Sequence, residues 1–162
     1  LEWDDSRRQL RWGVMFIYGA ALTLGAALVD HGVAEWLALG IFELVEGGGE
    51  LLLFSVIILL GVALTNIMSD GAAAAVLVPI TLAVGVAADL DLAMVAILTA
   101  ISTAFAFATA FGTPPNLIVH ASGIPGSADF VRNGVPMVLL AVLVLLAAQR
   151  YYWPLATGWL GL

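Results

Sequence analysis

The sequence contains no cysteine and no lysine, and it is poor in charged side chains of either sign. Without cysteine there is no disulfide framework, no thiolate metal site and no cysteine nucleophile. The five basic residues, all arginines, are outnumbered by 12 acidic residues, and the net charge of −7 excludes a basic surface for nucleic acid. Only 10% of the 162 residues are charged, well below the roughly 25% of soluble domains.

Hydrophobic residues make up 62% of the chain. A soluble fold of this size still exposes roughly a third of the surface of its unfolded chain, so it could not bury this much apolar area. The composition therefore excludes a cytosolic enzyme and a disordered chain, and it predicts an all-α integral membrane protein with residues 1–162 in one transmembrane domain. No nucleophile–base pair, phosphate loop or zinc spacing is present, so we expect no enzyme activity.

Apolar runs divide the chain into membrane elements. Residues 13–29 are long enough to cross, and residues 33–45 are less apolar and are predicted to lie at the interface. Residues 51–88 form two apolar arms around a polar interruption at 65–71, and residues 135–148 cross again. The chain begins at Leu1, in mid-pattern, and we expect it to be a piece of a longer protein.

Neither arm of 51–88 comfortably spans a bilayer alone. The first arm, 51–64, reaches about 21 Å as a helix, against a hydrocarbon core of about 30 Å. Length alone allows three arrangements: one kinked span, two short spans or a re-entrant hairpin. The arginine pattern favours the hairpin, because it places the acidic loops 30–50 and 89–91 outside together and Arg132 on the same inner side as Arg7, Arg8 and Arg11.

Residues 92–122 contain no Asp, Glu, Lys or Arg, but a straight helix of that length would be about 46 Å long. Two consecutive prolines at 114 and 115 remove two amide donors and interrupt the helix. We therefore predict a discontinuous helix, broken at residues 112–116. For the break to lie at mid-depth, the first piece has to unwind early, near Thr109, or tilt.

Unwound backbone inside a membrane is tolerated only where it is buried in protein or lines a wet cavity, and paired breaks are typical of transporter sites. The second hairpin arm begins near residues 69–71, where its free amides favour an anion. The first arm ends near residues 65–68, where free carbonyls favour a hard cation such as sodium. An anion site beside a cation site is the arrangement that ion-coupled anion uptake needs.

Two motifs carry a family resemblance. The segment TNIMSDGAAAA at 65–75 and the segment GTPPNLIV at 112–119 resemble the second hairpin and the broken helix of the divalent anion/sodium symporter (DASS) family, which transports dicarboxylates and sulfate. The resemblance covers nearly the whole chain, in order. It implies the C-terminal inverted repeat of an ion-transporter fold, with the N-terminal half of the transporter outside this sequence, and a possible homodimer.

The resemblance also implies binding residues. A substrate oxyanion would meet Ser69, Asp70, Gly71 and Thr113, and sodium would be held by Thr65, Asp70 and the carbonyls of Met68 and Gly112. Two positions depart from the family pattern: Asp70 stands where Asn is usual, and Gly71 stands where Thr is usual. The carboxylate strengthens a cation site and weakens a dianion site.

The expected function is secondary active transport in the plasma (inner) membrane, in which a cation, sodium above all, drives uptake of a divalent anion such as a dicarboxylate or sulfate. Sodium is the coupling ion, and no other cofactor is expected. An arsenite or sodium/proton transporter of the same superfamily is an alternative that Asp70 favours. A membrane bundle subunit without transport activity is the alternative from another class, and the two paired breaks oppose it.

Overall fold

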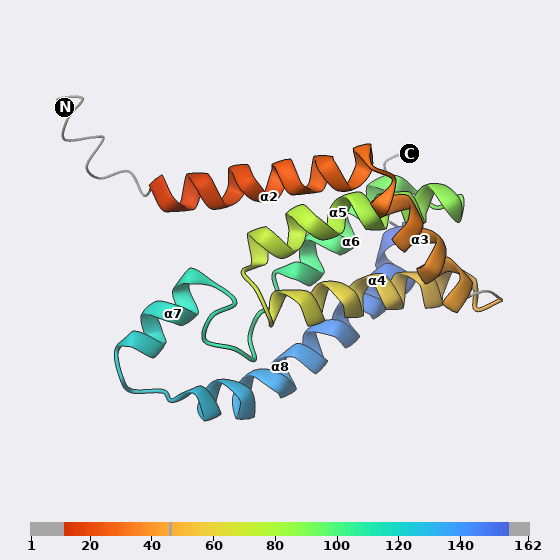
Figure 1. Ribbon diagram of the computed structural model, residues 1–162. Coiled ribbons are helices and arrows are strands. Elements are labelled where there is room, and N and C mark those ends of the chain that lie inside the picture. Colours follow the sequence, from red (N-terminus) through yellow and green to blue (C-terminus); the bar gives the residue numbers. More distant parts are fainter. Residues whose placement is uncertain (1–11, 46, 156–162) are drawn as a thin grey trace.

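A computed structural model describes residues 12–45 and 47–155, and all regular secondary structure in these ranges is helical (Figure 1). Arg7, Arg8 and Arg11, on which the predicted orientation depends, lie outside the described residues. The helices, in chain order, are α2 (Trp12–Asp30), α3 (Val33–Leu44), α4 (Gly49–Thr65), α5 (Asp70–Ala87), α6 (Leu92–Thr103), α7 (Pro114–Ala121), α8 (Ser127–Ala147) and a π-helix η1 (Ala148–Tyr152).

α2 and α3 form a bent pair. The chain turns by 73° between them, and Gly32 takes a left-handed backbone conformation at φ 69°, which glycine adopts without a steric penalty. Asp70–Ala87 and Ser127–Leu155 are each long and apolar enough to cross a membrane, and the bent pair makes a third crossing if it is taken as one broken span. α3 lies against α5.

α4 and α5 form the predicted helical hairpin, joined by a short tip at residues 66–69 (Figure 1). Its two open ends lie together, because Gly49 and Asp89 line one cavity. The expectation that neither arm spans alone is wrong for α5, whose 18 residues are long and apolar enough to cross. The helix begins at Asp70, two residues before the apolar run, and this gives it the extra length.

The helical structure between residues 92 and 122 is interrupted, but the interruption is longer than predicted and begins earlier. α6 ends at Thr103, and residues 104–113 are not helical. Pro114 and Pro115 occupy the first two positions of α7, where proline is tolerated because those amides have no helical partner. The prolines therefore begin the second piece instead of interrupting the helix, and the unwinding expected near Thr109 starts several residues earlier.

α8 begins at Ser127, eight residues before the predicted crossing at 135–148. Its start is capped by Asp129, whose carboxylate accepts the Gly126 N–H at 2.9 Å. Arg132 lies in the first turns of α8 and Arg150 follows its C-terminal end. Arg150 and Glu50 line one cavity, and Glu50 and Asp89 line a neighbouring one. Asp89 and Arg132 therefore lie toward opposite ends of the bundle, and their placement on opposite sides of the membrane stays a prediction.

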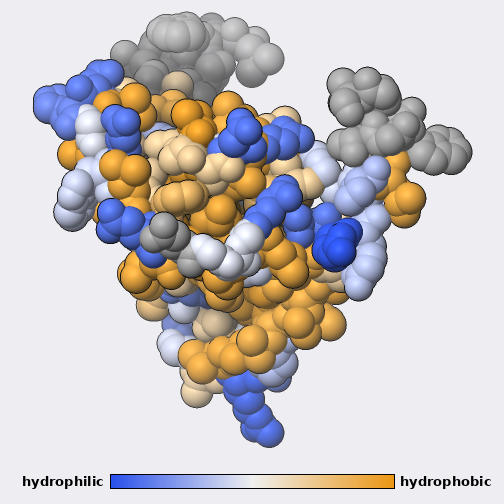
Figure 2. Space-filling view, turned by 90° about the vertical axis from the view of Figure 1, so that its right-hand side faces the viewer, coloured by the Kyte–Doolittle hydropathy of each residue, from blue (hydrophilic) through white to orange (hydrophobic). Residues whose placement is uncertain are grey.

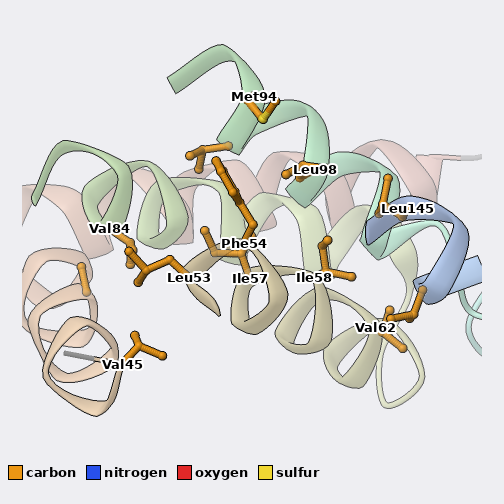
Figure 3. Packing of buried hydrophobic residues seen from close by; sticks show 13 residues of the cluster. Val45, Leu53, Phe54, Ile57, Ile58, Val62, Val84, Met94, Leu98 and Leu145 are labelled. Carbon is orange, nitrogen blue, oxygen red and sulfur yellow. The ribbon is translucent and has the colours of Figure 1, made fainter. Parts of the chain in front are cut away.

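The core gathers around α4, whose buried face packs against α6, α5 and α8 (Figure 3). Phe54, Ile57 and Ile58 are fully buried there. A polar contact joins α5 and α6, because the Thr99 and Thr81 hydroxyls lie 2.9 Å apart with both side chains fully buried. Such hydroxyl pairs link helices in membrane proteins. The rigid core leaves the hairpin tip and the unwound segment at one end of the α4–α6 bundle.

Candidate functional site

The hairpin tip meets the unwound segment. The backbone N–H of Asp70, the first residue of α5, donates to the Gly112 carbonyl at 3.1 Å. The approach leaves no room for a side chain, because a Cβ on Gly112 would lie 2.4 Å from the Ala106 Cβ and 3.1 Å from the Thr65 carbonyl oxygen. The predicted meeting of the two breaks is therefore confirmed, and glycine is required at 112.

Asn66 holds the tip to the unwound segment with its side-chain amide. Its Nδ2 donates to the Phe105 carbonyl at 3.2 Å and to the Val62 carbonyl at 2.8 Å. Its Oδ1 accepts the Ala108 N–H at 3.1 Å. The amide thus replaces hydrogen bonds that the backbone lost when the helix unwound, as buried backbone groups require.

Asn116 does the same from the other side of the break. Its Nδ2 donates to the Ala106 carbonyl at 2.7 Å and to the Thr109 carbonyl at 3.0 Å. Together the two asparagines bond four backbone groups of the segment 104–113. In an apolar setting each of these groups would cost several kcal/mol if left unpaired (an order-of-magnitude figure).

Thr65, expected to bind sodium, is the last residue of α4 and is fully buried. Its hydroxyl has no hydrogen-bond partner within residues 12–45 and 47–155, and neither has the buried hydroxyl of Thr109 in the unwound segment. Buried hydroxyls are normally paired. Each of these two hydroxyls, one at either break, lacks among the described residues the partner that a buried hydroxyl normally has.

Asp70 changes the expected character of the α5 N-terminus. Its own carboxylate accepts the Gly71 N–H at 2.7 Å, and its N–H is already given to Gly112. Of the first three amides of α5, only that of Ala72 has no acceptor among the described residues. We expected several free amides at this helix end to bind an anion, but only one amide is free. The Asp70 carboxylate occupies part of the position that the anion would take.

The remaining predicted site residues lie close by. Ser69 precedes α5 and makes no capping hydrogen bond with its hydroxyl. Thr113 caps α7, because its hydroxyl accepts the Asn116 N–H at 3.4 Å. Met68 donates its N–H to the Leu64 carbonyl. Gly71 lies on the other face of the tip and lines an apolar cavity between α2 and α5.

Asp70 is the only ionisable residue of the sequence between residues 51 and 88. No lysine or arginine occurs between Arg11 and Arg132, so Asp70 has no basic side chain near it in sequence. In the described part of the chain, no three His, Cys, Asp or Glu side chains gather as they would around a transition metal. Backbone carbonyls, hydroxyls and one carboxylate are the oxygen donors that a hard cation prefers.

Sequence reasoning missed Asn66 and Asn116. Each is an amide side chain beside a break in an apolar run, and a transmembrane amide normally bonds across to another helix. The sequence therefore allowed both asparagines to be predicted as hydrogen-bonding residues. It did not reveal their partners, because nothing in the sequence from Phe105 to Thr109 indicates that the helix unwinds there.

Comparisons with known proteins identify the family of this chain. The family described as the sodium:sulfate symporter transmembrane region matches residues 1–159. The chain belongs to that family. The family is one of transport proteins and not of enzymes, and the match together with the apolar helices makes the chain a multi-pass integral membrane protein.

Curated relatives support the assignment. An uncharacterised transporter of Haemophilus influenzae is 30% identical over 93% of this chain, and the sodium-dependent dicarboxylate transporter SdcS of Staphylococcus saprophyticus is 28% identical over 98% of it. The corresponding SdcS of Staphylococcus aureus is 26% identical. The chain spans about a third of the length of these relatives, 33% and 30% for the first two.

Proposed function

We propose that this chain supplies one ion-and-substrate site of a cation-coupled transporter for small divalent oxyanions such as a dicarboxylate or sulfate, with sodium as the coupling ion. The observation that carries the proposal is the junction between the Asp70 N–H and the Gly112 carbonyl, where two helix breaks meet in an apolar bundle. The family description and the name of the SdcS relatives support the substrate class and the ion.

In this proposal the cation binds where oxygen donors gather. The Thr65 hydroxyl, the Asp70 carboxylate and the carbonyls of Met68 and Gly112 would hold it. Ser69 and Thr113 would form the substrate side of the tip together with Asp70, whereas Gly71, which lines the cavity between α2 and α5, lies on the other face. The cation neutralises Asp70 and so removes the repulsion that an incoming anion meets, which couples the two binding events.

The test is uptake into proteoliposomes by the protein expressed from its complete reading frame. An inward sodium gradient should drive uptake of labelled succinate or sulfate. Thr65→Val removes one ligand without changing the side chain's shape, and it should raise the half-saturating sodium concentration by about tenfold or more. Thr23→Val is the matched control, because the exposed Thr23 hydroxyl bonds only to Gly19 of its own helix. Equal sodium dependence in both variants would contradict the assigned ion site.

We further propose that α4 and α5 enter and leave the membrane on one side. The clustering of Gly49 and Asp89 at one cavity supports this topology. The chain has no cysteine, so Gly48→Cys, Asp89→Cys and Arg132→Cys each carry one labelling site. The first two should react with an impermeant thiol reagent from the same side, and the third from the opposite side. Labelling of 48 and 89 from opposite sides would show that the hairpin crosses the membrane.

A proton- or cation-exchanging transporter is the second candidate, and Asp70 favours it because no other ionisable side chain lies between residues 51 and 88. The same liposomes separate the two. A pH gradient that drives sodium flux in the absence of any anion would support the exchanger. Anion uptake that needs sodium and no pH gradient would support the symporter.

A further inference from the structure

α8 packs its backbone directly against the unwound segment at one glycine. Gly134, near the start of α8, is buried. A Cβ added to it would overlap the Phe107 carbonyl oxygen and would lie 2.6 Å from the Ala108 Cα. Both neighbours are backbone atoms, which cannot rotate away as the end of a flexible side chain can. The packing of α8 on this segment therefore requires glycine at 134.

The peptide group that Gly134 contacts is also the one that Asn66 holds. The Phe107 carbonyl and the Ala108 N–H belong to one planar peptide group and point in opposite directions. The N–H donates to the Asn66 Oδ1 at 3.1 Å. The carbonyl accepts no hydrogen bond from the described residues and faces the Gly134 Cα, whose C–H groups are weak donors. One peptide group of the unwound segment thus lies between the hairpin tip and α8.

α8 is the more rigid of the two partners in this contact. Its second half is held in the core around α4, where Val142 and Leu145 are buried. The segment 104–113 is not helical, and the side-chain amides of Asn66 and Asn116 hold it in place. Bulk added at 134 should therefore displace the 107–108 peptide group and leave the helix where it is.

We propose that Gly134 is a positioning residue of the ion-and-substrate site. α8 supports the 107–108 peptide group through Gly134, and this peptide group fixes Asn66, which directly follows Thr65 at the end of α4. The position of α8 thereby sets where the oxygen donors of the tip lie. This role rests on the proposed function, whereas the contact between α8 and the tip can be tested without it.

Hydrogen exchange in the protein expressed from its complete reading frame tests the contact. Gly134→Ala should displace the 107–108 peptide group and break its bond to Asn66. Amides of residues 104–113 should then exchange about fivefold faster or more, as the loss of one hydrogen bond predicts. The tip, residues 66–71, should also exchange faster. Acceleration that is confined to α8, or no acceleration, would overturn the proposal.

Gly85→Ala is the matched control. Gly85 is a buried helix glycine whose added Cβ would lie 2.9 Å from the Leu92 Cδ2, and it lies in the last turn of α5, far along that helix from the tip. Figure 2 shows the end of the bundle where α5 ends, with hydrophilic side chains set among apolar ones. This variant should leave exchange in 104–113 unchanged. Equal acceleration in both variants would mean a general loosening of the bundle and would overturn the proposal.

Sodium dependence of uptake into liposomes tests the link to the site. Gly134→Ala should raise the half-saturating sodium concentration by about fivefold or more, whereas a variant that only folds less well lowers the maximal rate alone. In the Asn66→Ala background the same substitution should add little, because the peptide group is already released. An unchanged half-saturating concentration would overturn the proposal. If the unaltered protein shows no sodium-driven uptake, the proposed function fails, and hydrogen exchange still decides the role of Gly134.

The unaltered protein provides a measurement that does not depend on the folding of any variant. If one peptide group joins the tip to α8, residues 104–113 and the start of α8 should open as one unit. Peptides covering 104–113 and 128–138 should then lose protection with the same dependence on denaturant. α7 lies between them in sequence, and none of its described residues is buried, so it should open at lower denaturant. Separate opening of 104–113 and 128–138 would overturn the proposal.

Discussion

The amide of Asn66 makes the strongest prediction, because it joins two segments that are 42 residues apart in sequence through the Ala108 N–H. Asn66→Ala removes the acceptor of Ala108 and the donor to Phe105. Each part-buried backbone group that is left unpaired costs about 1–3 kcal/mol, and the two together cost about 2–4 kcal/mol when partial access of water is allowed for. The third bond, to Val62, lies within the end of α4 and adds little.

Amide hydrogen exchange, followed by mass spectrometry, measures this loss directly. A cost of about 2 kcal/mol or more corresponds to roughly 30-fold faster opening, and it should appear in peptides covering residues 104–113. Asn133→Ala is the matched control, because the exposed Asn133 side chain bonds only to the Asp129 carbonyl of its own helix. If the two variants exchange equally in 104–113, Asn66 does not hold the unwound segment and the reasoning fails.

Three further predictions concern the same region. Gly112→Ala should abolish sodium-driven uptake into liposomes, because a Cβ at 112 would meet Ala106 at 2.4 Å. Gly40→Ala should leave uptake unchanged in the same assay, because Gly40 has open space around it. Thr99→Val should lower the unfolding free energy by about 1 kcal/mol, as measured by denaturant titration, since it breaks the pair with Thr81. Asp70→Asn should weaken sodium binding by about tenfold or more, and calorimetry without substrate measures this loss; unchanged affinity would remove Asp70 from the ion site.

The hairpin is the part of the fold that sequence reasoning predicted best. The apolar arms at 51–64 and 72–88 became α4 and α5, with boundaries shifted by at most two residues. Two long apolar runs separated by a polar tip are expected to form two helices, because a backbone in an apolar setting has to make its hydrogen bonds within its own segment. The polar tip itself also identified the candidate site, since unwound backbone there needs partners from elsewhere.

The extent of the break could not be predicted in the same way. Residues 104–111 read AFAFATAF, which is as apolar as the helix before them and contains no proline or glycine. The helix ends at Thr103 because the amides of Asn66 and Asn116 bond the backbone that follows, and these are tertiary contacts. Local propensity is overridden by such contacts, whereas the start of α8 had a readable signal in the Asp129 cap.

The negative charge of Asp70 at the hairpin tip affects how the cation and the substrate anion bind there. A helix N-terminus with free amides attracts an anion, yet here one amide is bonded to Gly112 and the next to the Asp70 carboxylate. The chain's own negative charge therefore occupies part of the position that a substrate oxyanion would use. With no lysine or arginine between Arg11 and Arg132, a bound cation is the compensating charge that this segment can recruit. Under the proposed function, a substrate anion then meets a neutral tip only after the cation has bound, so its affinity should depend on sodium more steeply in this protein than in its own Asp70→Asn variant.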